Sequence, residues 1–101
     1  MTATITISEG VPSAHYPEPE RARNGATDYT VAIVSGAASV TGEITLYRGA
    51  DGRMSAGGTH VDVWCSSSVV AWLGSMDRQD REAAVAALES GQGTYDVEVA
   101  S

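Results

Sequence analysis

The chain has 101 residues, with 13 Asp and Glu, six Arg and no Lys, so its formal net charge is −7 at pH 7. A chain of this length forms one domain and is too short for two separate hydrophobic cores. Its 43% content of hydrophobic residues excludes an acidic disordered tail. One cysteine excludes an internal disulfide, and no apolar run approaches the roughly 18 residues that cross a bilayer. We therefore expect a single cytoplasmic domain over residues 1–101 that makes no membrane contact.

The first predicted element is a strand over residues 4–8, in which Ile5 and Ile7 alternate with hydroxyl residues. Residues 9–27 lose this alternation and hold all three prolines of the chain, so we expect a long loop there. Connections of this length are either functional or mobile. The sequence leaves open which of the two applies.

Two strands of a meander are predicted next, over residues 28–34 and 40–47. Their inward-facing residues are Tyr29, Val31 and Ile33 in the first strand and Val40, Ile44 and Leu46 in the second. Gly42 interrupts the second pattern, which predicts a bulge or a close approach of another backbone.

A turn and a further strand follow. Asp51 and Gly52 are a hairpin signal, because glycine accepts the positive φ of tight turns. We expect a strand to return over residues 54–65. Alternation places Trp64 on the face opposite Cys65, although the sequence leaves open which face is buried.

After this strand the period of the pattern becomes helical. The hydroxyls of residues 66–68 are expected to cap a first helix, and Asp77 a second helix, with Asp80 in a capping-box position and Gly91 at the end. The apolar positions are Val69, Val70, Leu73 and Met76 in the first helix and Ala84, Val85 and Leu88 in the second.

Residues 94–99 give the clearest strand pattern, with Tyr95, Val97 and Val99 on the face opposite the polar residues. The predicted order is β-β-β-β-α-α-β. It indicates an α+β fold, an antiparallel sheet of four to five strands with two short helices packed on one face. The other face of the sheet is then open to solvent or to a partner.

The sequence lacks the patterns of an active site. His60 and Asp62 share a strand face near residues 66–68, but neighbours on a strand do not give the geometry of a Ser-His-Asp triad. His15, His60 and Cys65 lack the paired spacing of a zinc site. The glycines between strands do not form a phosphate loop. We expect a binding protein with no metal and no cofactor, not an enzyme.

The negative charge is concentrated in the second part of the chain. Residues 61–101 contain seven carboxylates and two arginines. This balance disfavours direct nucleic-acid binding and favours a basic protein or ribonucleoprotein complex as partner, although acidity also serves solubility alone. The candidate partner-binding residues are Asp77, Asp80, Glu82 and Glu89 on the predicted helices and Asp96 and Glu98 on the last strand.

A short acidic intracellular chain with a strand meander, two helices and no catalytic motif resembles the small inhibitors that phages and mobile elements make against host defences, anti-CRISPR proteins among them. The resemblance implies a stoichiometric inhibitor that binds a host effector and blocks nucleic-acid loading, target recognition or assembly. The alternative left open is a structural homodimer of a phage or bacterial protein without catalytic activity, formed through a sheet edge or through the open sheet face near Tyr47 or Trp64.

Overall fold

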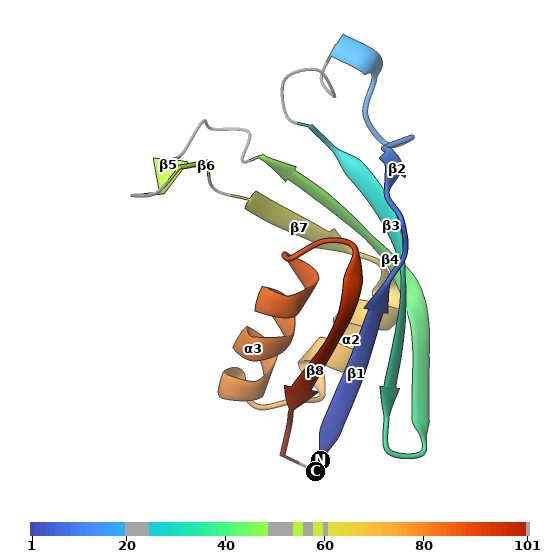
Figure 1. The fold of residues 1–101 in the computed structure, drawn as a ribbon, viewed down its shortest axis with the longest axis vertical. Coiled ribbons are helices and arrows are strands. Elements are labelled where there is room, and N and C mark those ends of the chain that lie inside the picture. The colour runs from blue at the N-terminus through green and yellow to red at the C-terminus, as the bar shows by residue number, and fades with distance from the viewer. Residues whose placement is uncertain (20–24, 49–53, 56–57, 60, 101) are drawn as a thin grey trace.

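A computed structural model of the chain describes residues 1–19, 25–48, 54–55, 58–59 and 61–100. In chain order its elements are β1 (Thr2–Ile7), β2 (Val11–Pro12), β3 (Thr27–Ser35), β4 (Ala38–Arg48), β5 (Met54–Ser55), β6 (Gly58–Thr59), β7 (Val61–Cys65), α2 (Ser67–Gly74), α3 (Arg78–Leu88) and β8 (Gly93–Glu98). Figure 1 shows both helices on one side of the twisted sheet, with the chain termini side by side.

The main sheet has six strands in the order β7-β4-β3-β1-β8, with β2 paired to β3, and every ladder in it is antiparallel. The first four long strands form a meander, and the two helices carry the chain from β7 at one edge to β8 at the other. The predicted α+β fold and the order of its long strands and helices are confirmed. The structure adds the short β2 and a separate β5–β6 ladder.

The core lies between the helices and one face of the sheet. Alternate residues of β1, β3 and β4 face inward, as their sequence patterns predict, and the largest fully buried side chains include Ile5, Ile33 and Ile44. Leu88 of α3 is also fully buried. Val70, expected in the apolar stripe of the first helix, is instead 54% exposed. Val69 and Leu73, four residues apart on one helix face, are the buried residues of α2. Val70 follows Val69 directly and therefore points away from that face, toward solvent.

The strand expected over residues 54–65 is shorter than predicted. β7 begins at Val61, opposite Arg48 of β4, while Met54–Ser55 pairs with Gly58–Thr59 in the separate ladder. The predicted Asp51-Gly52 turn and His60 lie outside the described residues.

The segment 9–27, predicted as a loop, contains β2. Both β1 and β2 pair with β3, but their registers differ by one residue, since Ile7 pairs with Val31 and Val11 with Asp28. This shift is a β-bulge at residues 8–10. Because cross-strand partners share a face, the bulge turns Val11 to the open face of the sheet, where it is 57% exposed.

Ser66 and Ser68 do not cap α2 through their hydroxyls, contrary to expectation. Ser66 occupies the N-cap position without a side-chain cap bond, and its Oγ accepts from the Glu43 N–H at 2.9 Å. The Ser68 Oγ donates to the Thr41 carbonyl at 2.7 Å. The β4–β7 ladder ends at the Ile44–Cys65 pair, so the serines instead satisfy backbone groups of β4 that lie beyond it.

The close contact between α2 and β4 depends on Gly42. A Cβ atom at this position would lie 2.5 Å from the Ser68 Oγ, 2.6 Å from the Ser66 Oγ and 2.7 Å from Val69 Cγ2. The predicted bulge is absent, since the β3–β4 register runs without interruption through Gly42, and the atoms that approach Gly42 closely belong to side chains of the α2 segment, not to another backbone. The missing side chain lets the start of the helix sit directly on the strand.

The predicted ends of α3 are also confirmed. The Asp77 side chain accepts from the Asp80 N–H at 3.0 Å, which is the expected N-cap bond. After the helix, Gly91 has a φ of 81°, the left-handed conformation predicted there. The Asp80 carboxylate does not complete a reciprocal capping box, because it accepts from the Ala100 N–H at 2.7 Å. It thereby ties the C-terminal segment to the helix.

Candidate functional site

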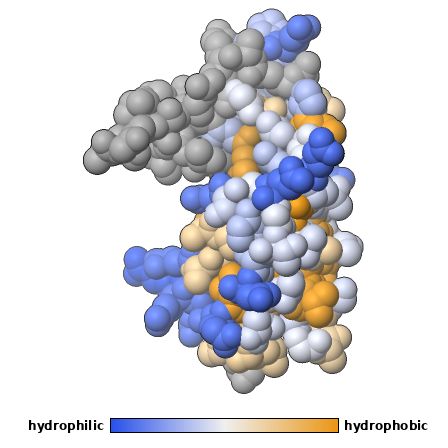
Figure 2. Space-filling model, in the orientation of Figure 1, coloured by the Kyte–Doolittle hydropathy of each residue, from blue (hydrophilic) through white to orange (hydrophobic). Residues whose placement is uncertain are grey.

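The structure divides the six predicted partner-binding carboxylates between the two faces of the sheet. Asp77, Asp80, Glu82 and Glu89 lie on α3 and its caps, on the helical side, and Figure 2 shows strongly hydrophilic residues gathered along this helix. Asp96 and Glu98 project from β8 to the open face, because the alternate residues of that strand pack toward the helices. The six residues therefore do not form one continuous acidic face.

Most carboxylates on the α3 side have local structural roles. Asp77 caps the helix, Asp80 holds Ala100, and Glu82 accepts from Arg78 Nε at 3.0 Å across one helical turn. Glu89 differs because it is the exposed C-cap of α3. A negative charge at this end is opposed by the helix dipole, so helix stability does not account for Glu89.

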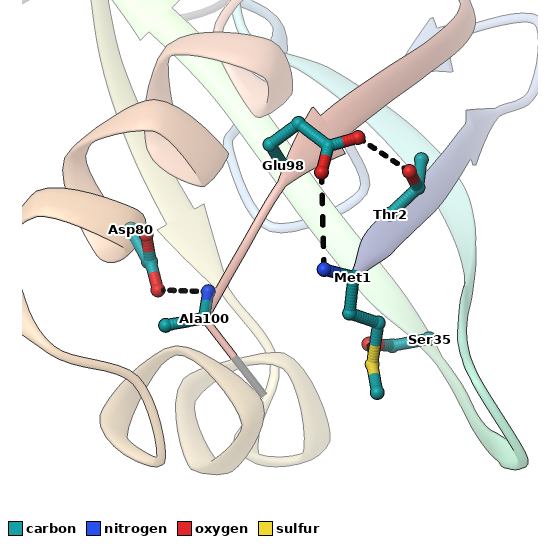
Figure 3. A network of polar contacts seen from close by, with 6 residues as sticks. All are labelled: Met1, Thr2, Ser35, Asp80, Glu98 and Ala100. Carbon is teal, nitrogen blue, oxygen red and sulfur yellow. Dashed lines mark hydrogen bonds and ion pairs between the residues drawn. The ribbon is translucent and has the colours of Figure 1, made fainter.

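On the open face, the carboxylates of β8 lean toward β1. The Thr4 hydroxyl donates to Asp96 Oδ1 at 2.9 Å, and the Thr2 hydroxyl donates to Glu98 Oε1. Figure 3 shows Glu98 also facing the Met1 amine, 3.8 Å from Glu98 Oε2. These contacts orient the carboxylates without burying them, since the Glu98 side chain remains 78% exposed.

β8 is an edge strand, and the backbone groups that point away from the sheet are those of its exposed residues, two of which are acidic. The Val99 N–H donates to the Met1 carbonyl at 2.8 Å, in register with the β1–β8 ladder. Hydrogen bonding in an antiparallel ladder alternates along the strand, so the N–H and C=O groups of Thr94, Asp96 and Glu98 point away from β1. Within the described residues β8 pairs with β1 alone. This β8 edge offers backbone hydrogen bonds and carboxylates at the same residues.

A second feature of the open face is an anchored segment that sequence reasoning did not single out, residues 13–16. It follows β2 and is bound to Asp28 of β3, whose Oδ2 accepts from the Ala14 N–H at 3.2 Å. The Thr45 hydroxyl donates to Asp28 Oδ1 at 2.6 Å, and His15 Nε2 lies 4.0 Å from Oδ2. Asp28 thus joins this segment to the surface formed by β3 and β4.

Hydrogen bonding favours the ionised form of Asp28. Burial raises the pKa of this carboxyl, but hydrogen bonds from Thr45, Ser13 and the Ala14 N–H, together with the charge of His15, lower it by more. The net result is a pKa below the ordinary value of 3.8. A carboxylate is therefore held at the base of the 13–16 segment at neutral pH.

The 13–16 segment brings aromatic rings onto the sheet. The His15 ring lies 5.5 Å from the Trp64 ring, tilted by 46°, and the Tyr16 ring lies 5.8 Å from that of Tyr47, tilted by 44°. A hollow of about 360 Å³ is lined by His15, Tyr16, Thr45 and Trp64, and we call it the aromatic hollow. Trp64 is 47% exposed, on the face opposite the half-buried Cys65. The alternation predicted for this strand is confirmed, and the helical face is the buried one.

Local sequence signals do not indicate this hollow. His15 and Tyr16 lie in the proline-containing segment expected as a loop, and Asp28 is a single carboxylate at the start of a strand. The strand register aligns Asp28, Thr45 and Trp64 in one row across β3, β4 and β7. This row forms the surface on which the 13–16 segment lies, and it exists only once the register of the three strands is set.

Comparison with known proteins finds no family model, no curated protein and no solved structure that matches this chain. In the part of the chain that the structure describes, no group of three or more His, Cys, Asp and Glu residues is placed to hold a metal ion. No helix among these residues is long and apolar enough to span a membrane. The β8 edge and the aromatic hollow are the candidate binding surfaces described above.

Proposed function

We propose that this protein is a small acidic binding module that pairs its β8 edge with a basic segment of a partner protein. In the narrower form of the proposal, the partner is a basic nucleic-acid-handling complex and the module is its stoichiometric inhibitor. One observation carries the proposal: the outward backbone groups of β8 belong to Asp96, Glu98 and Thr94, and all three residues are exposed.

An edge strand of this kind favours a particular kind of partner. An extended segment adds to a sheet edge through main-chain hydrogen bonds, and its alternate side chains supply specificity. Lys or Arg at every second position of such a segment would meet Asp96 and Glu98 on the open face. The net charge of −7 adds long-range attraction for a basic partner.

The same charges oppose pairing of β8 with a second copy of itself. Around a two-fold axis, antiparallel β8 strands would bring the Asp96 and Glu98 carboxylates of one copy against those of the other. Like charges directly opposite one another destabilise a sheet, and acidic side chains are a common protection of exposed edges. The β8 edge therefore favours a basic partner over self-association.

The proposed inhibition is a competition with nucleic acid for the positively charged surface of the partner. Proteins that handle nucleic acid use Lys and Arg to neutralise phosphates. A module that occupies those cations with carboxylates competes with the nucleic acid for the same surface. Such competition is stoichiometric and is weakened by salt.

The proposal is tested by capturing the partner from a bacterial lysate with tagged protein at low and moderate salt. The Asp96→Arg/Glu98→Arg double variant is compared with a Glu9→Arg/Glu18→Arg control, whose carboxylates are also exposed and whose change in net charge is the same. We expect the wild type and the control to retain one basic complex in near-equal amounts, and the β8 variant to lose it. Equal capture by all three proteins, or equal loss by both variants, contradicts the β8 edge as the site.

Two further measurements complete the test. Thermal unfolding of each variant shows that a loss of capture is not a loss of fold. Light scattering across a dilution series separates the module from the homodimer alternative, because a free module keeps the 10.5 kDa mass of the chain and a tight dimer keeps twice that mass. A persistent dimer would overturn the proposal in favour of self-association.

A further inference from the structure

The aromatic hollow lies at the edge of the sheet opposite β8. Trp64 belongs to β7, which four strand spacings of about 4.8 Å each separate from β8. Among the described residues that line the hollow, His15, Tyr16 and Trp64 carry rings, and Thr45 lies beside them. Its aromatic walls come from two distant parts of the chain, so the fold itself assembles it.

The ring contacts hold this surface in place. Trp64 packs against His15 and still keeps 47% of its surface exposed. Tyr16 is half-buried and packs against Tyr47. Large rings that are braced by neighbours and open to solvent on one side are the usual anchors of a recognition surface.

Aromatic ring faces and one carboxylate lie at the hollow. The faces of Trp and Tyr rings carry the negative part of their quadrupole. Directly behind the lining, the Asp28 carboxylate accepts from the Thr45 hydroxyl at 2.6 Å and lies 4.0 Å from the His15 ring nitrogen. The arginines of the described residues whose side chains are placed, Arg78 and Arg81, lie on α3, on the other side of the sheet. Ring faces backed by a carboxylate attract a cation.

We infer that the aromatic hollow binds one arginine side chain of a protein partner, with the guanidinium against the Trp64 and Tyr16 rings. Arginine fits this chemistry better than lysine, because its planar and weakly hydrated cation stacks on aromatic faces. The hollow is a second site, distinct from the β8 edge. The inference does not require the proposed pairing at β8, and each of the two fails or succeeds separately.

The test uses two short probes with the full-length protein, acetyl-Gly-Arg-Gly-amide and the same peptide with citrulline, which keeps the shape of arginine and removes its charge. Each is titrated at pH 8 while the amide of Thr45 and the two indole N–H signals are followed by NMR. We expect saturable shifts at Thr45 and Trp64, with Trp72 in the helix α2 as the internal control. The citrulline peptide should bind with an affinity at least about tenfold lower than that of the arginine peptide.

Two substitutions at one position separate ring chemistry from apolar contact. Trp64→Tyr keeps an aromatic face and should retain most of the arginine response at the Thr45 amide, whereas Trp64→Leu keeps an apolar side chain and should lose it. Because Trp64 is half-exposed on the open face, both variants are expected to fold, which their amide spectra verify. Equal binding of the arginine and citrulline peptides, equal responses of the two variants, or no saturable shift at Thr45 would each overturn the inference.

Discussion

At the level of single residues, Gly42 shows how an absent side chain positions a helix. The hydroxyls of Ser66 and Ser68 reach the β4 backbone on either side of it, and the space that a Cβ would need is already filled. Both serines were expected to serve α2 itself. They serve β4 instead, because buried or partly covered backbone groups must find a partner wherever the ladder ends.

Replacing Gly42 with Ala should destabilise the protein. The new methyl group would force the two serine hydroxyls and Val69 to move, and we expect a loss of about 2–3 kcal/mol in the free energy of unfolding from overpacking and weakened hydrogen bonds. Urea denaturation measures the loss. Gly74→Ala is the matched control, since a Cβ there meets nothing within 4 Å, and it should be neutral or slightly stabilising. Similar losses in both variants would contradict the close-approach argument.

Asp28 is a second residue whose role depends on its neighbours. Its carboxylate accepts from the Ala14 N–H and the Thr45 hydroxyl, and its pKa lies below the usual value. Because the pKa is lowered in the folded state, the stabilisation by the carboxylate is fully present above the ordinary pKa of 3.8. That stabilisation is lost as the pH falls through the folded pKa.

Asp28→Asn should therefore destabilise the protein at pH 7, and the effect should shrink as the pH falls through the lowered pKa of Asp28 and the wild-type carboxyl takes up a proton. The amide must turn its NH₂ group toward one of the donors from which Asp28 accepts, and we expect a loss of about 1–2 kcal/mol at pH 7. Chemical denaturation of both proteins at pH 7 and at a series of acidic pH values measures the difference. Glu18→Gln at an exposed position provides the comparison. A loss independent of pH would show that charge on Asp28 is not the cause.

At the level of elements, α3 is held by its own cap, by the core and by the chain segment that follows β8. Its N-cap bond begins the helix, its buried Ala84, Ala87 and Leu88 pack toward the core, and Asp80 holds the chain just after β8. Sequence signals predicted both ends of this helix because caps are local. The contact between Asp80 and Ala100 is a tertiary one, and no local pattern indicates it.

Removing the cap should weaken α3 as a unit. Asp77→Ala leaves the Asp80 N–H without its acceptor, and we expect a loss of about 1 kcal/mol. For a domain of this size, that loss lowers the melting temperature by roughly 4–8 °C. Thermal unfolding followed by circular dichroism measures the shift. Gln79→Ala, exposed in the same turn, should leave the melting temperature nearly unchanged, and an equal drop in both variants would rule out capping as the cause.

At the level of the whole molecule, the sheet separates two kinds of surface. One face is covered by the helices, and the other carries hydroxyl residues, the carboxylates of β8 and, near β7, the aromatic hollow. The proposed pairing with a basic strand and the inferred arginine site lie at opposite edges of this open face. A partner that uses both would have to span the sheet.

The sequence alone determined the fold class, the alternation of the long strands and the ends of α3. Alternation and caps depend on neighbouring residues, so they are visible in a single chain. The tertiary structure decided that Asp96 and Glu98 lie on the face opposite the α3 carboxylates. It also decided that Ser66 serves β4. Both outcomes depend on which strands become neighbours.

The aromatic hollow was beyond sequence reasoning for the same physical reason. Its lining joins residues 15 and 16 to Thr45 and Trp64, and these meet because a bulge shifts β2 by one residue and Asp28 holds the following segment on the sheet. Side chains far apart in sequence come together only when strand order and register are fixed. The sequence supplied the rings and the carboxylate, and the packing of the sheet placed them side by side.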